Sequence, residues 1–311
     1  MFSEVHSGFV AVAGRPNVGK SSLVNALCGG KVTIVSDKPQ TTRRRIFGIA
    51  NGDGYQLVLA DLPGFQRPLD PLTQRMQRTV DSSFEDLDAV LLVVDARAHI
   101  GAGDRFIAQR VFALGVPVVI AVNKVDRLKP AHIASQMQTA AALAASAGGK
   151  ATGTRPETGA SGASGDFHAL HPVSAKTGEG IAELREELVG LLPEGPLYYP
   201  AEQRTDLSVE EQIAELVREQ ALALTREEVP HSISAEVEEM EDKVVRASVI
   251  VETESQKQIL VGKGGSMVRK IGMQARPAIE GLLGQKIYLE LKVKVRPRWR
   301  RDESTLERLG L

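Results

Sequence analysis

Hydrophobic runs and turn residues divide the chain into two parts with different patterns. Through residue 195, short apolar runs alternate with amphipathic stretches, and they predict strands at 9–13, 44–50, 55–60, 89–94, 116–122 and 169–173. Strands that alternate with helices form a mainly parallel sheet with helices on both faces. The turn sequence Asn-Gly-Asp-Gly at 51–54 is typical of a β-hairpin, so one of these strands must be antiparallel.

The pattern changes after a Pro- and Gly-rich stretch at 192–200, which indicates a domain boundary. Beyond it the chain predicts a helix at 207–225, strands at 231–239 and 243–252, two helical segments and a last strand at 286–295. We therefore expect an α/β domain at 1–195, a linker at 196–205 and a smaller α+β domain at 206–311.

Residues 144–167 interrupt the first pattern. They are rich in Gly, Ala, Ser and Thr and have no apolar periodicity. Such a segment cannot bury enough surface to offset the entropy that is lost when it is ordered. We expect a disordered insertion here, and the alternative is a specific binding loop.

Charge is distributed unevenly within the second part. The chain has a formal net charge of −1, but 206–242 holds twelve acidic and two basic residues, whereas 257–301 holds twelve basic and two acidic residues. The basic stretch predicts an anionic partner, and the acidic stretch a solvated face. Cys28 is the single cysteine, so the chain has no internal disulfide and suits a reducing cytosol. From the hydropathy pattern we expect neither a signal peptide nor a membrane span.

Residues 14–21 read Gly-Arg-Pro-Asn-Val-Gly-Lys-Ser and match the phosphate-binding loop G-x-x-x-x-G-K-[ST] at every required position. The loop lies between a predicted strand and a predicted helix, where backbone N–H groups and the helix N-terminus attract phosphate. Lys20 is expected to reach the terminal phosphates, and the Ser21 hydroxyl to bind Mg²⁺. The expected phosphate-site residues are Gly14, Arg15, Pro16, Asn17, Val18, Gly19, Lys20, Ser21 and Ser22.

Three further motifs follow predicted strands, at the sheet edge where open α/β sheets bind ligands. In N-K-x-D, the Asp126 carboxylate can accept two hydrogen bonds from guanine but finds no such pair on adenine. Asp61 is expected to hold Mg²⁺ through water, and the Gly64 N–H to sense the γ-phosphate. The backbone of 174–176 could close over the base. These motifs comprise Asn123, Lys124 and Asp126; Asp61, Leu62, Pro63 and Gly64; and Ser174, Ala175 and Lys176. They predict GTP and GDP, with Mg²⁺, as the ligands.

With Gln40-Thr41-Thr42-Arg43, these motifs resemble the Era branch of translation-factor-like GTPases, over nearly the whole chain. The resemblance implies GTP hydrolysis coupled to 30S ribosomal subunit assembly, binding to the 3′ end of small-subunit ribosomal RNA, and peripheral membrane association. We expect a cytoplasmic monomer whose switch segments, near 32–45 and 62–80, control RNA engagement. The expected catalytic residues are Lys20, Thr41, Thr42, Asp61 and Gly64, and the Mg²⁺ ligands are Ser21, Asp61 and either Thr41 or Thr42.

Three positions bear on the rate of hydrolysis. Phe65 stands where a Gln orients the attacking water in Ras-like enzymes, and the resemblance implies an apolar residue at this position. Intrinsic hydrolysis should therefore be slow. Leu62 departs from the usual D-T-P-G by the loss of a hydroxyl. Asn17 either helps to bind K⁺ near the phosphates, as in related potassium-activated GTPases, or only caps local backbone. Phe65 leaves open a GTP-binding RNA chaperone with negligible turnover, whereas N-K-x-D argues against a metabolic P-loop kinase.

The basic stretch contains Gly262-Lys263-Gly264-Gly265, a G-x-x-G loop between two helical segments. Its glycines allow close backbone approach, and the next helix N-terminus faces phosphates, which is how a KH domain clamps about four nucleotides. The order of elements resembles the α-β-β-α-α-β form of the KH fold. Trp299 either stacks on a base or caps the core. The expected RNA-binding residues are Gly262, Lys263, Gly264, Gly265, Arg269, Lys270, Arg296, Arg298, Trp299, Arg300 and Arg301.

The expected fold is therefore an α/β P-loop GTPase domain followed by an α+β KH-type RNA-binding domain.

Overall fold

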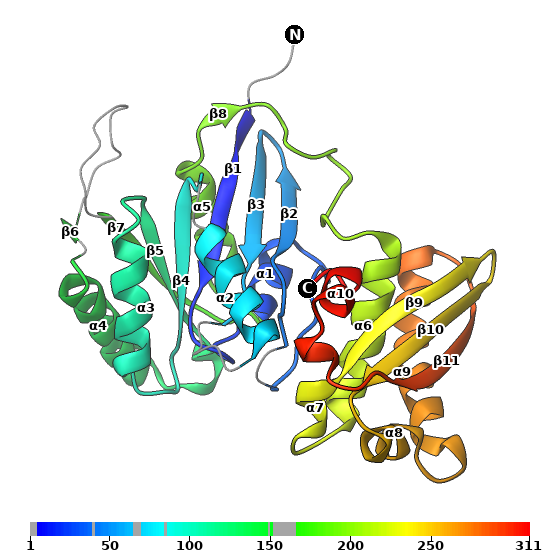
Figure 1. Ribbon diagram of the computed structural model, residues 1–311. Coiled ribbons are helices and arrows are strands. Elements are labelled where there is room, and N and C mark those ends of the chain that lie inside the picture. Colours follow the sequence, from blue (N-terminus) through cyan, green and yellow to red (C-terminus); the bar gives the residue numbers. More distant parts are fainter. Residues whose placement is uncertain (1–4, 39–40, 65–69, 84–85, 149, 152–165) are drawn as a thin grey trace. The chain divides into compact units, whose positions relative to one another are not determined.

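The computed structural model describes residues 5–38, 41–64, 70–83, 86–148, 150–151 and 166–311, and it divides into two compact units (Figure 1). The first unit comprises Met1–Thr33, Arg45–Gln66 and Gln77–Asp206. The second comprises Ile34–Arg44, Arg67–Met76 and Leu207–Leu311. Two short segments from the first half of the sequence thus belong to the C-terminal unit.

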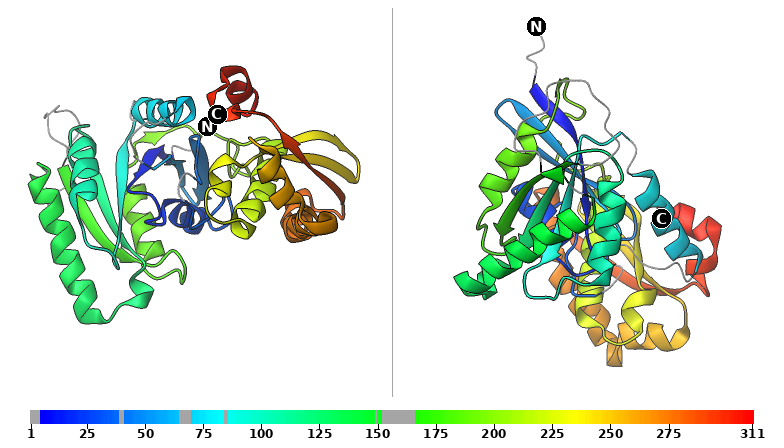
Figure 2. Two further views of the ribbon diagram at one scale, coloured as in Figure 1. Left: turned by 60° about the horizontal axis from the view of Figure 1, so that its bottom comes forward. Right: turned by 90° about the vertical axis from the view of Figure 1, so that its left-hand side faces the viewer.

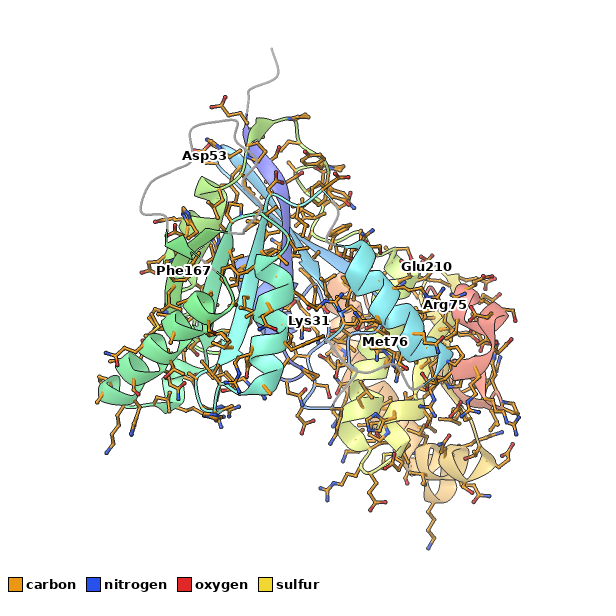
Figure 3. The ribbon with its side chains drawn as sticks, turned by 60° about the vertical axis from the view of Figure 1, so that its left-hand side comes forward. Lys31, Asp53, Arg75, Met76, Phe167 and Glu210 are labelled. Atoms are coloured by element: carbon orange, nitrogen blue, oxygen red, sulfur yellow. The ribbon has the colours of Figure 1, made fainter. Side chains whose placement is uncertain are left out.

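The first unit is built on a mainly parallel sheet with the strand order β2-β3-β1-β4-β5-β7-β6. Its strands are β1 (Val5–Ala13), β2 (Ile46–Gly52), β3 (Tyr55–Asp61), β4 (Ala89–Asp95), β5 (Val118–Asn123), β6 (Lys150–Ala151), β7 (Asp166–Val173) and β8 (Glu194–Gly195). β2 runs antiparallel to β3, and β8 runs antiparallel to β1. The predicted hairpin is confirmed, because Gly52 pairs with Tyr55 across the turn that carries Asp53 (Figure 3).

Helices cover both faces of this sheet (Figures 1 and 2). One apolar cluster joins the sheet to α3 (Ala102–Phe112), α4 (Pro130–Ser146) and Val80 of α2 (Pro71–Ser82). A second cluster, on the other face, joins it to α1 (Lys20–Leu27) and α5 (Ile181–Gly190). The central strands carry apolar residues on both faces, so their sequences are continuous apolar runs, as is usual for parallel sheets.

The residues after β8 cover the edge of the sheet. The backbone N–H of Ile49, on edge strand β2, donates to the Arg204 carbonyl at 2.9 Å. The Gln56 side chain accepts from the N–H groups of Tyr198 and Tyr199 at 2.8 and 2.9 Å. This stretch therefore satisfies backbone groups that an open edge would leave exposed.

The predicted ends of the insertion at 144–167 are wrong. Helix α4 continues to Ser146, with Ala144 fully buried, because its apolar face packs under the sheet. Strand β6 pairs in parallel with the start of β7, where Lys150 is opposite Asp166 and Ala151 opposite Phe167. The remaining core of the predicted insertion, at 152–165, lies outside the described residues.

The second unit has a three-stranded sheet of order β11-β10-β9, in which β11 is parallel and β9 antiparallel to β10. Its elements are α6 (Val209–Leu224), α7 (Val229–Ser232), β9 (Ser234–Glu241), β10 (Val244–Val251), α8 (Glu254–Val261), α9 (Ser266–Leu283), β11 (Tyr288–Val295) and α10 (Glu303–Arg308). Helices α6 and α9 share one apolar core with the sheet, through residues such as Val217, Ile271 and Val249. This is the predicted α-β-β-α-α-β order.

Candidate nucleotide site and RNA-binding surface

The phosphate loop connects β1 to α1 through two glycines, at each of which a side chain would be strained and would collide with a neighbouring group. Gly14 has φ +151°, and a Cβ there would lie 2.5 Å from the Val93 carbonyl oxygen. Gly19 has φ +101°, and its Cβ would lie 2.3 Å from Nδ2 of Asn123. α1 has no acidic residue in its first turn, and Gly19 offers no capping side chain. The N–H groups of this turn therefore remain suited to an anionic ligand.

Lys20 lies buried at the start of α1. Its Nζ donates to the carbonyls of Gly14 and Arg15, both at 3.1 Å. Burial lowers the Lys20 pKa from 10.5 to about 8, and the nearby Asp61 carboxylate raises it in part. The ammonium is thus poorly solvated in the free protein, so a phosphate anion would stabilise its charged form.

Asp61 ends β3 at the same edge of the sheet, and its side chain is completely buried. The Thr33 hydroxyl donates to its Oδ2 at 3.1 Å, a contact that the sequence pattern did not predict. A Cβ at Gly64 would lie 2.9 Å from Cγ of Pro16, so the Asp61–Gly64 segment passes directly against the phosphate loop. The Asp61 carboxylate and the Ser21 hydroxyl are hard oxygen donors of the kind that Mg²⁺ prefers, so these residues fit the ion.

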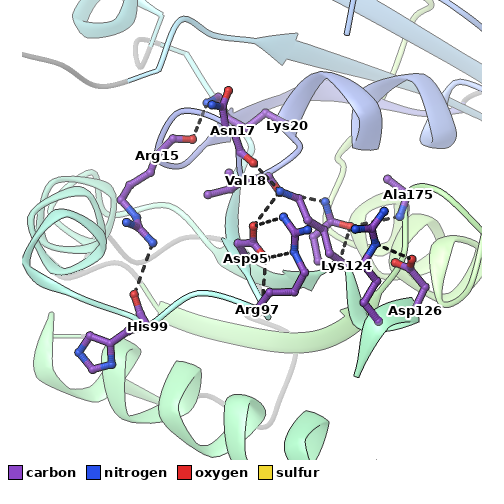
Figure 4. A network of polar contacts seen from close by, with 12 residues as sticks. Arg15, Asn17, Val18, Lys20, Asp95, Arg97, His99, Lys124, Asp126 and Ala175 are labelled. Atoms are coloured by element: carbon purple, nitrogen blue, oxygen red, sulfur yellow. Dashed lines mark hydrogen bonds and ion pairs between the residues drawn. The ribbon is translucent and has the colours of Figure 1, made fainter. Parts of the chain in front are cut away.

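A network of polar contacts organises the expected base site (Figure 4). Asn123 Nδ2 donates to the Val18 carbonyl at 3.0 Å, and its Oδ1 accepts from the Ala175 N–H at 3.1 Å. The Ser174 hydroxyl donates to Oδ1 of Asp126 at 2.8 Å. The phosphate loop, N-K-x-D and the Ser174 loop are therefore brought together, around a cavity of about 290 Å³.

The sequence analysis did not identify two residues of this network, Asp95 and Arg97. Lys124 Nζ donates to the Asn17 carbonyl at 2.5 Å and to Oδ2 of Asp95 at 2.7 Å. Arg97 donates to the Asp95 carboxylate through Nε and Nη2, and it lines the base cavity. Hydrogen bonds from Arg97 and Lys124 lower the Asp95 pKa to about 2, against the effect of burial. Asp95 ends β4 at the sheet edge that binds ligands, and this position could have marked it.

The first-switch threonines lie in the second unit. The Thr41 hydroxyl donates to the Lys38 carbonyl at 2.6 Å, and Thr42 is buried. Their assignment to Mg²⁺ stays a prediction. Phe65 lies outside the described residues.

The G-x-x-G loop has the expected exposed glycine backbone. Gly262 ends α8, and Gly264 and Gly265 have φ +59° and +78° before α9 begins. A Cβ at either Gly264 or Gly265 would meet open space, so a polynucleotide backbone has access there. Lys263, within the loop, is exposed, and so are Arg269 and Lys270 on the first turns of α9.

Trp299 does not belong to this surface, and its assignment as an RNA-binding residue is wrong. Its side chain is 1% exposed, and its Nε1 donates to the Ser232 carbonyl at 2.8 Å. It packs with Ile250 and Leu306, so it caps the core of the second unit and cannot stack on a base.

The arginines around Trp299 divide into two groups. Arg296 pairs with Glu236 at 2.9 Å, and Arg300 pairs with Glu252 at 2.8 Å. Arg298 and Arg301 are exposed. The latter two are thus the better candidates for phosphate contacts.

Comparisons with known families cover both units. Residues 9–124 match the family described as 50S ribosome-binding GTPase, and residues 228–300 match the KH domain. GTPase Era of Heliobacterium modesticaldum is 39% identical over 312 residues, covering 99% of this chain and 97% of that protein. GTPase Era of Mycobacterium sp. (strain KMS) is 40% identical over 317 residues, covering 99% of each.

Two solved structures are similar over the whole length. Era in complex with MgGDPNP and nucleotides 1506–1542 of 16S ribosomal RNA has a TM-score of 0.88 at 34% identity, covering 98% of this chain and 99% of that one. A variant of Aquifex aeolicus Era bound to GDP·AlF4⁻ gives the same values. Within the described part of this chain, no helix is long and apolar enough to cross a membrane.

Proposed function

The chain belongs to the Era family of GTPases, and we propose that its nucleotide state controls its binding to small-subunit ribosomal RNA during 30S subunit assembly. It hydrolyses GTP to GDP and phosphate. One observation carries the proposal: a base cavity formed by the phosphate loop, N-K-x-D and the Ser174 loop occurs in one chain with an open G-x-x-G loop.

In the nucleotide site, each motif has a distinct role. Lys20 and the first N–H groups of α1 neutralise the phosphates, and Asp126 reads the guanine N1–H and amine. Ser174 holds that carboxylate in place. Ser21, Asp61 and one of Thr41 and Thr42 would hold Mg²⁺, which, when bound, stabilises the charge that develops on the phosphate oxygens. Gly64 would sense the γ-phosphate.

In the second unit, the G-x-x-G loop would clamp single-stranded RNA, with Lys263, Arg269 and Lys270 against its phosphates. The similar structure that holds nucleotides 1506–1542 of 16S ribosomal RNA supports the 3′ end as the target. We also propose that K⁺ assists hydrolysis near Asn17, and that the protein is a cytoplasmic monomer whose membrane association is peripheral.

The enzymatic part is tested by phosphate release from GTP and from ATP. The wild-type protein should release phosphate from GTP alone, in the presence of Mg²⁺. Asp61→Asn should lose this activity, because the amide is a weaker ligand for Mg²⁺ than the carboxylate. Equal release from both nucleotides would contradict the assignment of the base site.

The RNA part is tested with a short single strand matching the small-subunit 3′ end. Changing Lys263 and Gly264 together to Asp should abolish binding, because carboxylates would meet the phosphates. Asp tolerates the left-handed backbone of Gly264, so the fold should survive. The matched control changes Gln285 and Lys286 to Asp, which alters charge equally on exposed residues outside the loop. Unchanged RNA affinity in the loop variant, with the fold confirmed by circular dichroism, would refute the KH assignment.

A further inference from the structure

The segment Ile34–Arg44, which carries the first-switch threonines, is built into the second unit. Ile34 is 2% exposed and belongs to the apolar core around Ile213 and Val217 of α6. The Val35 N–H donates to Oε1 of Glu219 at 3.0 Å. The segment thus starts from a firm attachment to α6.

Arg43, at the other end of the segment, fills a closed socket. Its side chain is 4% exposed, and Nη1 and Nη2 donate to the carbonyls of Ile233 and His231 at 2.6 and 3.1 Å. The guanidinium carbon lies 5.4 Å from the ring centre of Trp299. Trp299 is itself fixed by its hydrogen bond to Ser232. We call these residues, 231–233 and Trp299, the Arg43 socket.

The Arg43 guanidinium is buried in the socket with incomplete hydrogen bonding. The acceptors that the described residues give to the guanidinium are backbone carbonyls, and its Nε–H has no hydrogen-bond partner among them. A buried charge without a bonded carboxylate is tolerated only where the surrounding geometry is complete. We therefore expect the contacts of Arg43 with the socket to form together and to break together.

The two threonines lie directly beside this contact. Thr42 precedes Arg43, and the Thr41 carbonyl accepts from Nη2 of Arg218 at 2.5 Å. The same short segment therefore carries both these contacts within the second unit and the two threonines that are predicted to bind Mg²⁺.

We propose that Arg43 is a positioning residue, which holds the first-switch segment in the second unit in the GDP state and leaves its socket when GTP binds. This inference rests on the proposed function. It adds the residue through which the nucleotide would change the second unit. Since binding free energies are reciprocal, RNA that favours the open socket would also favour GTP.

The chain reports on the socket directly, because Trp299 is its single tryptophan. We would measure tryptophan emission and acrylamide quenching of the full chain with GDP and with a non-hydrolysable GTP analogue. In the wild-type protein, the analogue should expose the ring and raise quenching above the GDP value. In Arg43→Leu the difference in quenching between the two nucleotides should be lost. The preference of this variant for the analogue over GDP should rise, by about tenfold if the equilibrium between closed and open socket shifts by ~1.4 kcal/mol.

The matched control is Arg45→Leu. Arg45 is two residues away, exposed, and stacked over Phe47 of the first unit. It should keep the wild-type quenching difference. A fluorescent guanine nucleotide measures binding independently: failure of the wild-type protein to bind it would refute the proposed function instead.

Two results would overturn the role of Arg43. One is equal quenching with GDP and analogue in a wild-type protein that binds both. The other is a wild-type difference in Arg43→Leu with an unchanged nucleotide preference. Should Arg43→Leu not fold, the first result still decides the question.

Discussion

Lys20 should make guanine-nucleotide binding and protein stability respond to pH in opposite directions. Its pKa is lowered from 10.5 to about 8 because burial of the ammonium outweighs the attraction of the Asp61 carboxylate. The bound phosphates would add negative charge beside Lys20 and return its pKa toward the ordinary value. Binding therefore takes up protons above pH 7, and affinity should fall as pH rises through 8.

The magnitude follows from the shift. The difference between 10.5 and about 8 is about 2.5 units, which corresponds to about 3.4 kcal/mol at 1.36 kcal/mol per unit. At pH 8, nucleotide binding should take up about half a proton, and at pH 9 the affinity should be about tenfold lower than at pH 7. For the nucleotide-free protein the sign is reversed. The unfolded chain keeps its Lys20 proton between pH 8 and 10.5, so stability should rise with pH in that range.

Calorimetry of GDP binding in buffers of different ionisation enthalpy measures the proton uptake. The control is Lys20→Met, which cannot titrate and should show no uptake from this site. Guanine itself loses its N1 proton at high pH, and this background appears in both proteins. Proton release at pH 8, or equal proton uptake in Lys20→Met, would show that Lys20 does not take up the proton.

Three further predictions concern other residues. Asp126→Asn should shift preference from guanine toward xanthine, because the amide presents a donor beside an acceptor; competition among GTP, ATP and XTP measures this, and unchanged GTP preference would contradict it. Hydrolysis should be faster in KCl than in NaCl at equal ionic strength, and Asn17→Ala should remove the difference; equal wild-type rates would exclude K⁺ activation. Neutralising Arg298 and Arg301 should reduce the salt dependence of RNA binding by about 1.4 in log–log slope, at ~0.7 per contact, and an unchanged slope would place the contacts elsewhere.

The sequence predicted those features that depend on local pattern. The strand at 55–60 and the hairpin before it follow from apolar runs and turn residues, and β3 at Tyr55–Asp61 confirms them. The phosphate loop and N-K-x-D were recognisable because their chemistry needs fixed residues at short spacings. Their meeting at one sheet edge followed from strand order.

Features that depend on distant partners could not be predicted. The residues next to Trp299 in the sequence are compatible with stacking on a base and with packing in the core. Its hydrogen bond to Ser232, 67 residues away, shows that it packs in the core. Arg296 and Arg300 were counted as free charges, whereas Glu236 and Glu252, each more than 45 residues away in the sequence, pair with them. Thr33 has no motif of its own, so its hydrogen bond to Asp61 was invisible in the sequence.

Coupling between the GTP site and the RNA site should appear in the RNA affinity of the full chain. The measurement compares binding of a single-stranded small-subunit RNA end with GDP and with a non-hydrolysable GTP analogue, at one salt concentration. We expect tighter RNA binding with the analogue, by about fivefold or more, the lower range of ordinary allosteric coupling. Equal RNA affinity in the two nucleotide states would show that the two sites are not coupled.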